Sequence, residues 1–170
     1  MASKPMLTFL EATLQYCYVA KTSVHEEGLT VSTEKLAGET ILFFNTDCDE
    51  GRKTLHMVEQ GQKICDYLIF YTKDNEKREI VCYLELKGGK LENAKKQVLN
   101  THKRVRVLSE DKLGKLIEPV IWKACICLHG QAPRNGQRIV DELISIFGKN
   151  NVRIKHGVKH FKLLGEFLRG

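Results

Sequence analysis

Two acids and one amine stand inside the most hydrophobic part of the sequence. Asp66 belongs to the run ICDYLIFY, and Glu85 and Lys87 belong to the run IVCYLELK. Both runs are apolar on both faces, which is typical of strands in the middle of a sheet that helices cover on each side. A buried carboxylate without a partner costs several kcal/mol, so acids at these positions call for an explanation.

The stretch between the two runs brings these side chains together. Residues 72–79 (TKDNEKRE) are polar and predict a hairpin connection. Folding the hairpin about its middle, between Asn75 and Glu76, places Asp66 opposite Glu85, and the Cβ atoms of such a pair are about 5 Å apart. Lys87 follows Glu85 by two residues and therefore points to the same face.

Two facing carboxylates repel each other and favour a cation between them. Mg²⁺ prefers oxygen ligands and is often held by one or two carboxylates, with water completing its shell. A neighbouring lysine can orient or deprotonate a water molecule, or steady a phosphate oxygen. The set predicts metal-assisted phosphodiester hydrolysis. The structural alternative is that Asp66 caps the start of a strand, while Glu85 and Lys87 form a solvated strand end.

The remaining pattern predicts an α/β domain that positions this set. Helices are expected at residues 5–20, 90–102 and 135–147, and strands at 39–45, 64–71, 80–87 and 120–128. We expect loops at 21–37, with at most a short helix near 32–36, and at 46–54, an extended segment at 55–59, and two short strands at 152–155 and 161–168. No repeat, low-complexity segment or linker interrupts the chain. We therefore expect a single domain over residues 1–170, with a core at about 5–128 and a C-terminal part at 135–168.

Composition adds weak constraints. The 170 residues carry a formal net charge of +6, which favours polyanions such as nucleic acid. No apolar run is long enough to span a membrane. The six cysteines have no paired zinc spacing, and we expect reduced thiols in a cytoplasmic protein. Cys125 and Cys127 alternate onto one face of a buried strand, where core packing is favoured over metal binding.

On these residues the sequence resembles the PD-(D/E)xK nuclease superfamily, which has the restriction-endonuclease-like fold. Asp66 and Glu85-Leu86-Lys87 match its motif, and Gln97 matches a glutamine that many members carry on the following helix. The family's α-β-β-β-α-β order, with a mixed central sheet flanked by helices, agrees with the expected elements from Leu7 to Leu128. One departure is Cys65, which stands where the motif has proline.

The resemblance implies an Mg²⁺-dependent endonuclease in which Mn²⁺ can substitute. Asp66, Glu85 and Glu11 of the first helix would hold the metal, Lys87 would be catalytic, and Gln97 would support the site or the substrate. By its position alone, Glu11 is equally well a solvated helix edge. The resemblance further implies DNA rather than RNA as substrate, a role in microbial DNA defence or repair, and either a homodimer or a partner protein that delivers the substrate.

Two other hypotheses stay open. In the first, the chain is a catalytically silent member of the same fold that serves as a nucleic-acid-binding or scaffold subunit. In the second, it is an unrelated α/β interaction module. Basic residues after the motif are candidates for nucleic-acid binding: Lys90, Lys95, Lys96, Lys103 and Arg104. For each of them alone, an exposed helix face is the simpler interpretation. Of the six histidines, His56 and His102 are the ones that could approach the site.

Overall fold

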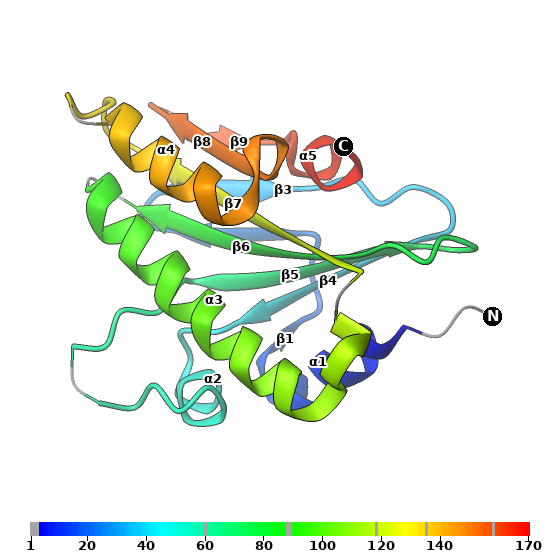
Figure 1. Ribbon diagram of the computed structural model, residues 1–170. Coiled ribbons are helices and arrows are strands. Elements are labelled where there is room, and N and C mark those ends of the chain that lie inside the picture. The colour runs from blue at the N-terminus through cyan, green and yellow to red at the C-terminus, as the bar shows by residue number, and fades with distance from the viewer. Residues whose placement is uncertain (1–3, 60, 88–89, 118, 135, 158) are drawn as a thin grey trace.

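A mixed sheet runs through the molecule. The computed structural model describes residues 4–59, 61–87, 90–117, 119–134, 136–157 and 159–170. The sheet has six strands in the order β1–β4–β5–β6–β7–β8 (Figure 1). Its strands are β1 (Tyr18–Val19), β4 (Glu39–Asn45), β5 (Tyr67–Lys73), β6 (Glu79–Lys87), β7 (Val120–Leu128) and β8 (Val152–His156). From β1 to β6 each neighbouring pair is antiparallel, whereas β7 and β8 continue parallel to β6.

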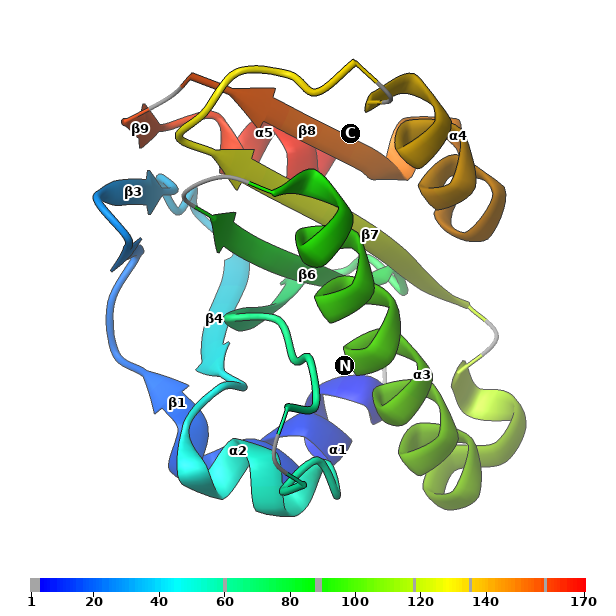
Figure 2. The ribbon, with the colours of Figure 1, turned by 90° about the vertical axis from the view of Figure 1, so that its left-hand side faces the viewer.

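Helices and a small second sheet cover the two faces. One face packs against α1 (Pro5–Leu14), α3 (Leu91–Leu113) and α4 (Gly136–Phe147). The other face packs against α5 (Leu164–Arg169) and a three-stranded sheet of β2 (Ser23–Glu26), β3 (Leu29–Ser32) and β9 (His160–Phe161). Figure 2 shows β6 between α3 on one side and β3 on the other. The strands that carry the candidate acids are therefore buried on both faces, as their composition predicts.

Apolar spacing explains how the helices dock. In α3 the residues Leu91, Ala94, Val98 and Val105 recur on one face and are fully or almost fully buried. This stripe continues beyond residue 102, so the helix runs to Leu113. The first helix is shorter than expected, because Gln15–Cys17 form a 3-10 turn and Tyr18 begins β1. Further 3-10 turns occur at Gly114–Ile117 and Lys149–Asn151.

Several expected elements are confirmed, and four are wrong. The strands expected at 39–45 and 120–128 have the observed bounds, and the one expected at 152–155 is β8 with one further residue. Residues 21–37 contain the β2–β3 hairpin, and no helix forms at 32–36. No strand forms at 55–59. Residues 161–168 mostly form α5, since Leu164, Phe167 and Leu168 have helical spacing. Gly88 and Gly89, expected to end a strand, and Asn135, the expected first residue of α4, lie outside the described residues.

The fourth error is α2 (Asp49–Thr54), which stands in the expected loop at 46–54. The thiol of Cys48 caps it by accepting a hydrogen bond from the Gly51 amide at 3.3 Å. Asp49 and Glu50 begin this helix and Arg52 and Lys53 end it, which complements the helix dipole. Gly51 is required, because a Cβ atom there would lie 2.5 Å from the Thr46 carbonyl oxygen. Across the described parts of the chain, we find no helix with the length and hydrophobicity of a membrane span.

Candidate active site

The β5–β6 hairpin has the predicted register. Tyr67 pairs with Leu84, and Thr72 pairs with Glu79 at the other end of the ladder. One further step places Asp66, which immediately precedes β5, opposite Glu85. The symmetric folding of residues 72–79 is thereby confirmed, and it brings the two acids to the same end of two central strands.

Short interactions join each carboxyl group to the backbone of the opposite segment, and join Lys87 to Glu85. The Asp66 amide donates to Glu85 Oε2 at 3.1 Å, and the Leu86 amide donates to Asp66 Oδ2 at 2.7 Å. Lys87 Nζ lies 3.3 Å from Glu85 Oε1. Each carboxyl group thus uses one oxygen to bind the backbone of the opposite strand, which fixes its direction.

Burial makes this pair electrostatically costly. Glu85 is 0% exposed and Asp66 is 8% exposed. Burial, followed by repulsion from Asp66, raises the pKa of Glu85 to about 9. Burial raises the pKa of Asp66 to about 6, although a hydrogen bond from Leu86 and the charge of Lys87 oppose the rise. Without an added cation, the site therefore favours a neutral Glu85 at neutral pH.

Lys87 is held in its charged form. Burial alone lowers the pKa of its amine, but the charges of Glu85 and Asp66 outweigh burial and raise the pKa above the ordinary value of 10.5. An amine with a raised pKa is a cation at neutral pH and a poor base. The expected role in removing a proton from water is therefore disfavoured here, and the role of steadying a phosphate oxygen is favoured.

The oxygens of the pair suit a hard cation. Glu85 Oε1 is buried and accepts no hydrogen bond within the described residues, so the ion pair with Lys87 is its observed contact. Carboxylate oxygens of this kind are the ligands that Mg²⁺ prefers, with water in the remaining positions. Among the described residues, no group of three or more His, Cys, Asp and Glu side chains is placed to hold a metal ion. Protein ligands would therefore be the two facing acids.

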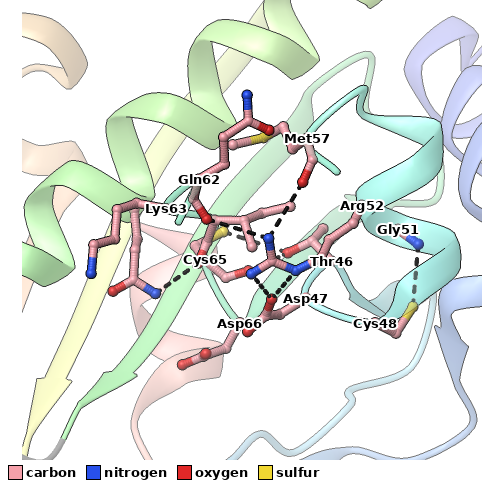
Figure 3. A network of polar contacts seen from close by, with 12 residues as sticks. Thr46, Asp47, Cys48, Gly51, Arg52, Met57, Gln62, Lys63, Cys65 and Asp66 are labelled. Atoms are coloured by element: carbon pink, nitrogen blue, oxygen red, sulfur yellow. Dashed lines mark hydrogen bonds and ion pairs between the residues drawn. The ribbon is translucent and has the colours of Figure 1, made fainter. Parts of the chain in front are cut away.

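Hydrogen bonds fix the backbone beside Asp66 from two sides (Figure 3). From the end of β4, the Thr46 hydroxyl donates to the Cys65 carbonyl, and the Thr46 amide donates to the Asp66 carbonyl at 3.0 Å. From α3, Thr101 Oγ1 accepts the Cys65 amide at 2.9 Å. The position of Asp66 therefore depends on its neighbours in space as well as on β5.

Gln97 has a positioning role. It is 6% exposed, and its side-chain amide donates to the Ile64 carbonyl at 2.7 Å. This hydrogen bond connects α3 to residues 64–65, which directly precede Asp66. The structure thus connects Gln97 to the site through the backbone, and this geometry agrees with support of the site.

Glu11 lies away from the pair. It is exposed on α1 and lines an open pocket with Gln15, Tyr18, Leu42 and Phe44. The expected metal ligand set of Glu11, Asp66 and Glu85 is therefore not assembled in this structure. The reason is that the first amides of α1 bind Glu79, at the opposite end of β6 from Glu85, and the helix then carries Glu11 to a position beside Leu42 and Phe44 of β4.

The basic candidates divide into two kinds. Lys95 is 7% exposed and forms ion pairs with Glu92, at 2.9 Å, and with Glu142. It links α3 to α4 in this structure, which favours a structural role for Lys95 over the expected contact with nucleic acid. The other candidates are exposed, at the start of α3 or on its outer face: Lys90, Lys96, Lys103 and Arg104.

The two candidate histidines have other surroundings. His102 packs against the rings of Tyr83, Trp122 and Phe147, and burial lowers its pKa to about 4. It is a neutral core residue at physiological pH. His56 is exposed just after α2, in a left-handed backbone conformation with φ of 53°.

The sequence analysis missed the acidic turn of the β2–β3 hairpin. Lys87 Nζ lies 3.8 Å from Glu27 Oε1, and the Tyr67 hydroxyl donates to Glu26 Oε1 at 3.0 Å. The charge of Glu26 contributes to the raised pKa of Asp66. The available signal was Glu27-Gly28 between two short alternating runs, because both residues have positive φ, as a two-residue hairpin turn requires.

Comparison with known proteins adds no relative. No family model matches the chain, and neither a curated protein nor a solved structure is significantly similar to it. The functional argument therefore depends on the geometry of the site.

Proposed function

We propose that this protein is an Mg²⁺-dependent endonuclease that hydrolyses phosphodiester bonds of DNA. The observation that carries the proposal is the buried acid pair Asp66 and Glu85 with the Lys87 amine 3.3 Å from Glu85. Such a pair destabilises the fold unless a cation or a proton neutralises it. A site that keeps this cost in the centre of a sheet is a candidate for function.

Each residue of the site has a separate role in the proposed hydrolysis. Mg²⁺ held by Asp66 and Glu85 would polarise a phosphoryl oxygen and lower the pKa of the attacking water. Lys87, a fixed cation beside that position, stabilises the negative charge that develops on the phosphate. The hydrogen bonds from Thr46 and Gln97 limit how far the Asp66 segment moves during the reaction.

The order of elements supports membership of the PD-(D/E)xK superfamily. α1, β4, β5, β6, α3 and β7 follow one another as α-β-β-β-α-β, with β1, β2, β3 and α2 inserted before β5. The mixed six-stranded sheet with helices on both faces agrees with that architecture. A role in microbial DNA defence or repair, and action as a homodimer or with a partner that delivers DNA, belong to the proposal through this resemblance.

One observation favours the catalytically silent alternative. Within the described ranges, the acid pair has no third ligand placed to hold a metal ion with it. A nucleic-acid-binding or scaffold subunit would bind DNA without needing a divalent cation. Metal binding therefore separates the two functions.

The test combines cleavage with metal binding. Asp66→Asn, Glu85→Gln and Lys87→Met should each lower Mg²⁺-dependent cleavage about a hundredfold or more on a panel of linear duplex, single strand, supercoiled plasmid, four-way junction and RNA. Glu11→Gln makes the same carboxylate-to-amide change outside the pair and should cleave like the wild type. Calorimetric titration with Mn²⁺ should show binding that Glu85→Gln loses. Full cleavage by Lys87→Met, or no Mn²⁺ binding by the wild type, would contradict the proposal.

A further inference from the structure

A pocket of about 300 Å³ opens between α3 and the segment that follows α2. Its lining residues are Met57, Gln62, Asn100, Lys103 and Arg104, and none of these is acidic. Asn100, Lys103 and Arg104 follow at the spacing that gathers side chains on one side of a helix. One wall is therefore a rigid helix that carries two cations.

The opposite wall is fixed by Arg52 (Figure 3). Its guanidinium donates to the Met57 and Gln62 carbonyls, each at 3.3 Å, and its Nε donates to Asp47 Oδ1 at 2.7 Å. Asn100 Nδ2 also donates to the Lys63 carbonyl at 3.2 Å, which joins this wall to α3. The shape of the pocket is thus built by side chains that bind backbone, and it exists before any ligand enters.

The two cations of the pocket have no acidic partner among the described residues. Within the described residues, Lys103 and Arg104 form no ion pair, whereas Lys95 and Arg106 on the same helix are paired with acids. A preformed concave site with two uncompensated positive charges favours an anion. Lysine and arginine are the usual contacts to phosphate oxygens of a nucleic acid backbone.

A short segment of the chain connects the pocket to the acid pair, and its length limits the distance between them. Gln62 precedes Asp66 by four positions, so their Cα atoms are at most about 14 Å apart. Phosphates of one DNA strand are separated by at least the axial rise of about 3.4 Å per nucleotide, so this distance spans at most about four nucleotide steps. A strand whose scissile phosphate lies at Asp66 therefore reaches the pocket with a neighbouring phosphate.

We infer that Lys103, Arg104 and the wall locked by Arg52 form a subsite for one non-scissile DNA phosphate, within about four nucleotides of the cut. The location relative to the cut rests on the proposed nuclease function, whereas phosphate binding by the pocket does not. Arg52 is a positioning residue in this subsite, since its contacts are to Asp47 and the two carbonyls.

The test is DNA binding in EDTA, where cleavage is absent. Fluorescence anisotropy with a labelled duplex should show about tenfold weaker binding for Lys103→Gln/Arg104→Gln than for the wild type. The slope of log affinity against log salt should fall by about 0.9, the value for one phosphate. Lys112→Gln removes one positive charge eight residues beyond Arg104 on α3 and should change affinity less than twofold.

A neutral-linkage scan locates the phosphate. Replacing single phosphates by methylphosphonates should reveal one or two positions that weaken wild-type binding about tenfold and do not weaken the double variant further. In Arg52→Met, methylphosphonates at these positions should no longer weaken binding. Circular dichroism shows whether this variant folds. Wild-type affinity in the double variant, or equal weakening by Lys112→Gln, would overturn the subsite. If the scan locates a phosphate in the pocket but the wild type shows no Mg²⁺-dependent cleavage, the nuclease proposal is refuted and the phosphate subsite is retained.

Discussion

Replacing the titratable Glu85 with glutamine should stabilise the metal-free protein above the ordinary pKa of a glutamate and abolish metal binding. The folded protein keeps the Glu85 proton up to a pKa of about 9, whereas the unfolded chain releases it near the ordinary value of 4.5. Between these values the folded state binds more protons than the unfolded state, so the free energy of unfolding falls as pH rises. The limiting slope is about 1.4 kcal/mol per pH unit. At pH 7.5, three units above 4.5, the loss reaches about 4 kcal/mol relative to acid conditions.

Glu85→Gln removes this titration and can keep the hydrogen bond from the Asp66 amide. Urea unfolding in EDTA should therefore show a stability difference between Glu85→Gln and the wild type that widens from pH 5 to pH 8. Adding Mg²⁺ at a thousand times its Kd should cancel the difference at pH 7.5, because the ligand then stabilises the wild type by about 4.1 kcal/mol and has no site in the variant. A difference that does not change with pH would refute the argument that Glu85 is a buried, repelled acid.

Four further predictions follow from other contacts. Lys87→Arg should keep a large part of the cleavage that Lys87→Met loses, because arginine retains the charge and cannot act as a base; loss of cleavage in both would favour proton transfer by Lys87. Gln97→Met should lower the free energy of unfolding by about 1–3 kcal/mol in urea, since it leaves the Ile64 carbonyl without its donor, and it should also lower kcat. Glu11→Gln should leave Mn²⁺ affinity unchanged in calorimetry. The hydrogen bonds of Arg169 lower the pKa of Glu39 to about 2, so Glu39→Gln should lose about 3 kcal/mol at pH 7 and much less near pH 2, measured by urea unfolding.

The hairpin could be predicted because its signals are local. Two apolar runs of similar length flank a polar stretch, and the pairing then has one register that keeps the apolar residues buried. The position of Asp66 opposite Glu85 follows from that register, and so does the side on which Lys87 lies. Gln97 could be placed on the correct helix for the same reason, although its hydrogen bond to Ile64 could not.

The remaining parts of the site come from contacts between distant segments. Glu27 approaches Lys87 because the β2–β3 hairpin packs on the opposite side of the sheet from α3, and no local pattern reports that packing. The lysine at position 95 looks like its exposed neighbours in sequence, and only the proximity of Glu142 on α4 makes it structural. Glu11 illustrates the converse, since its place on the first helix suggests a metal ligand, whereas the fold leaves it in a different pocket beside Leu42 and Phe44.

Two other acids of the same sheet, Glu39 and Glu79, are buried but fully hydrogen-bonded. Glu39, which is 4% exposed, accepts hydrogen bonds from Tyr71 and Arg169 and from the Leu36 amide, so this buried acid is fully paired. Glu79 is also buried, and it binds the free amides at the start of α1. These two acids show that the same sheet satisfies a carboxylate wherever its role is structural. Glu85 is buried as deeply, yet within the described residues its Oε1 accepts no hydrogen bond and has the 3.3 Å ion pair with Lys87 as its contact. The contrast within one sheet is the strongest reason to assign Glu85 a ligand rather than a structural role.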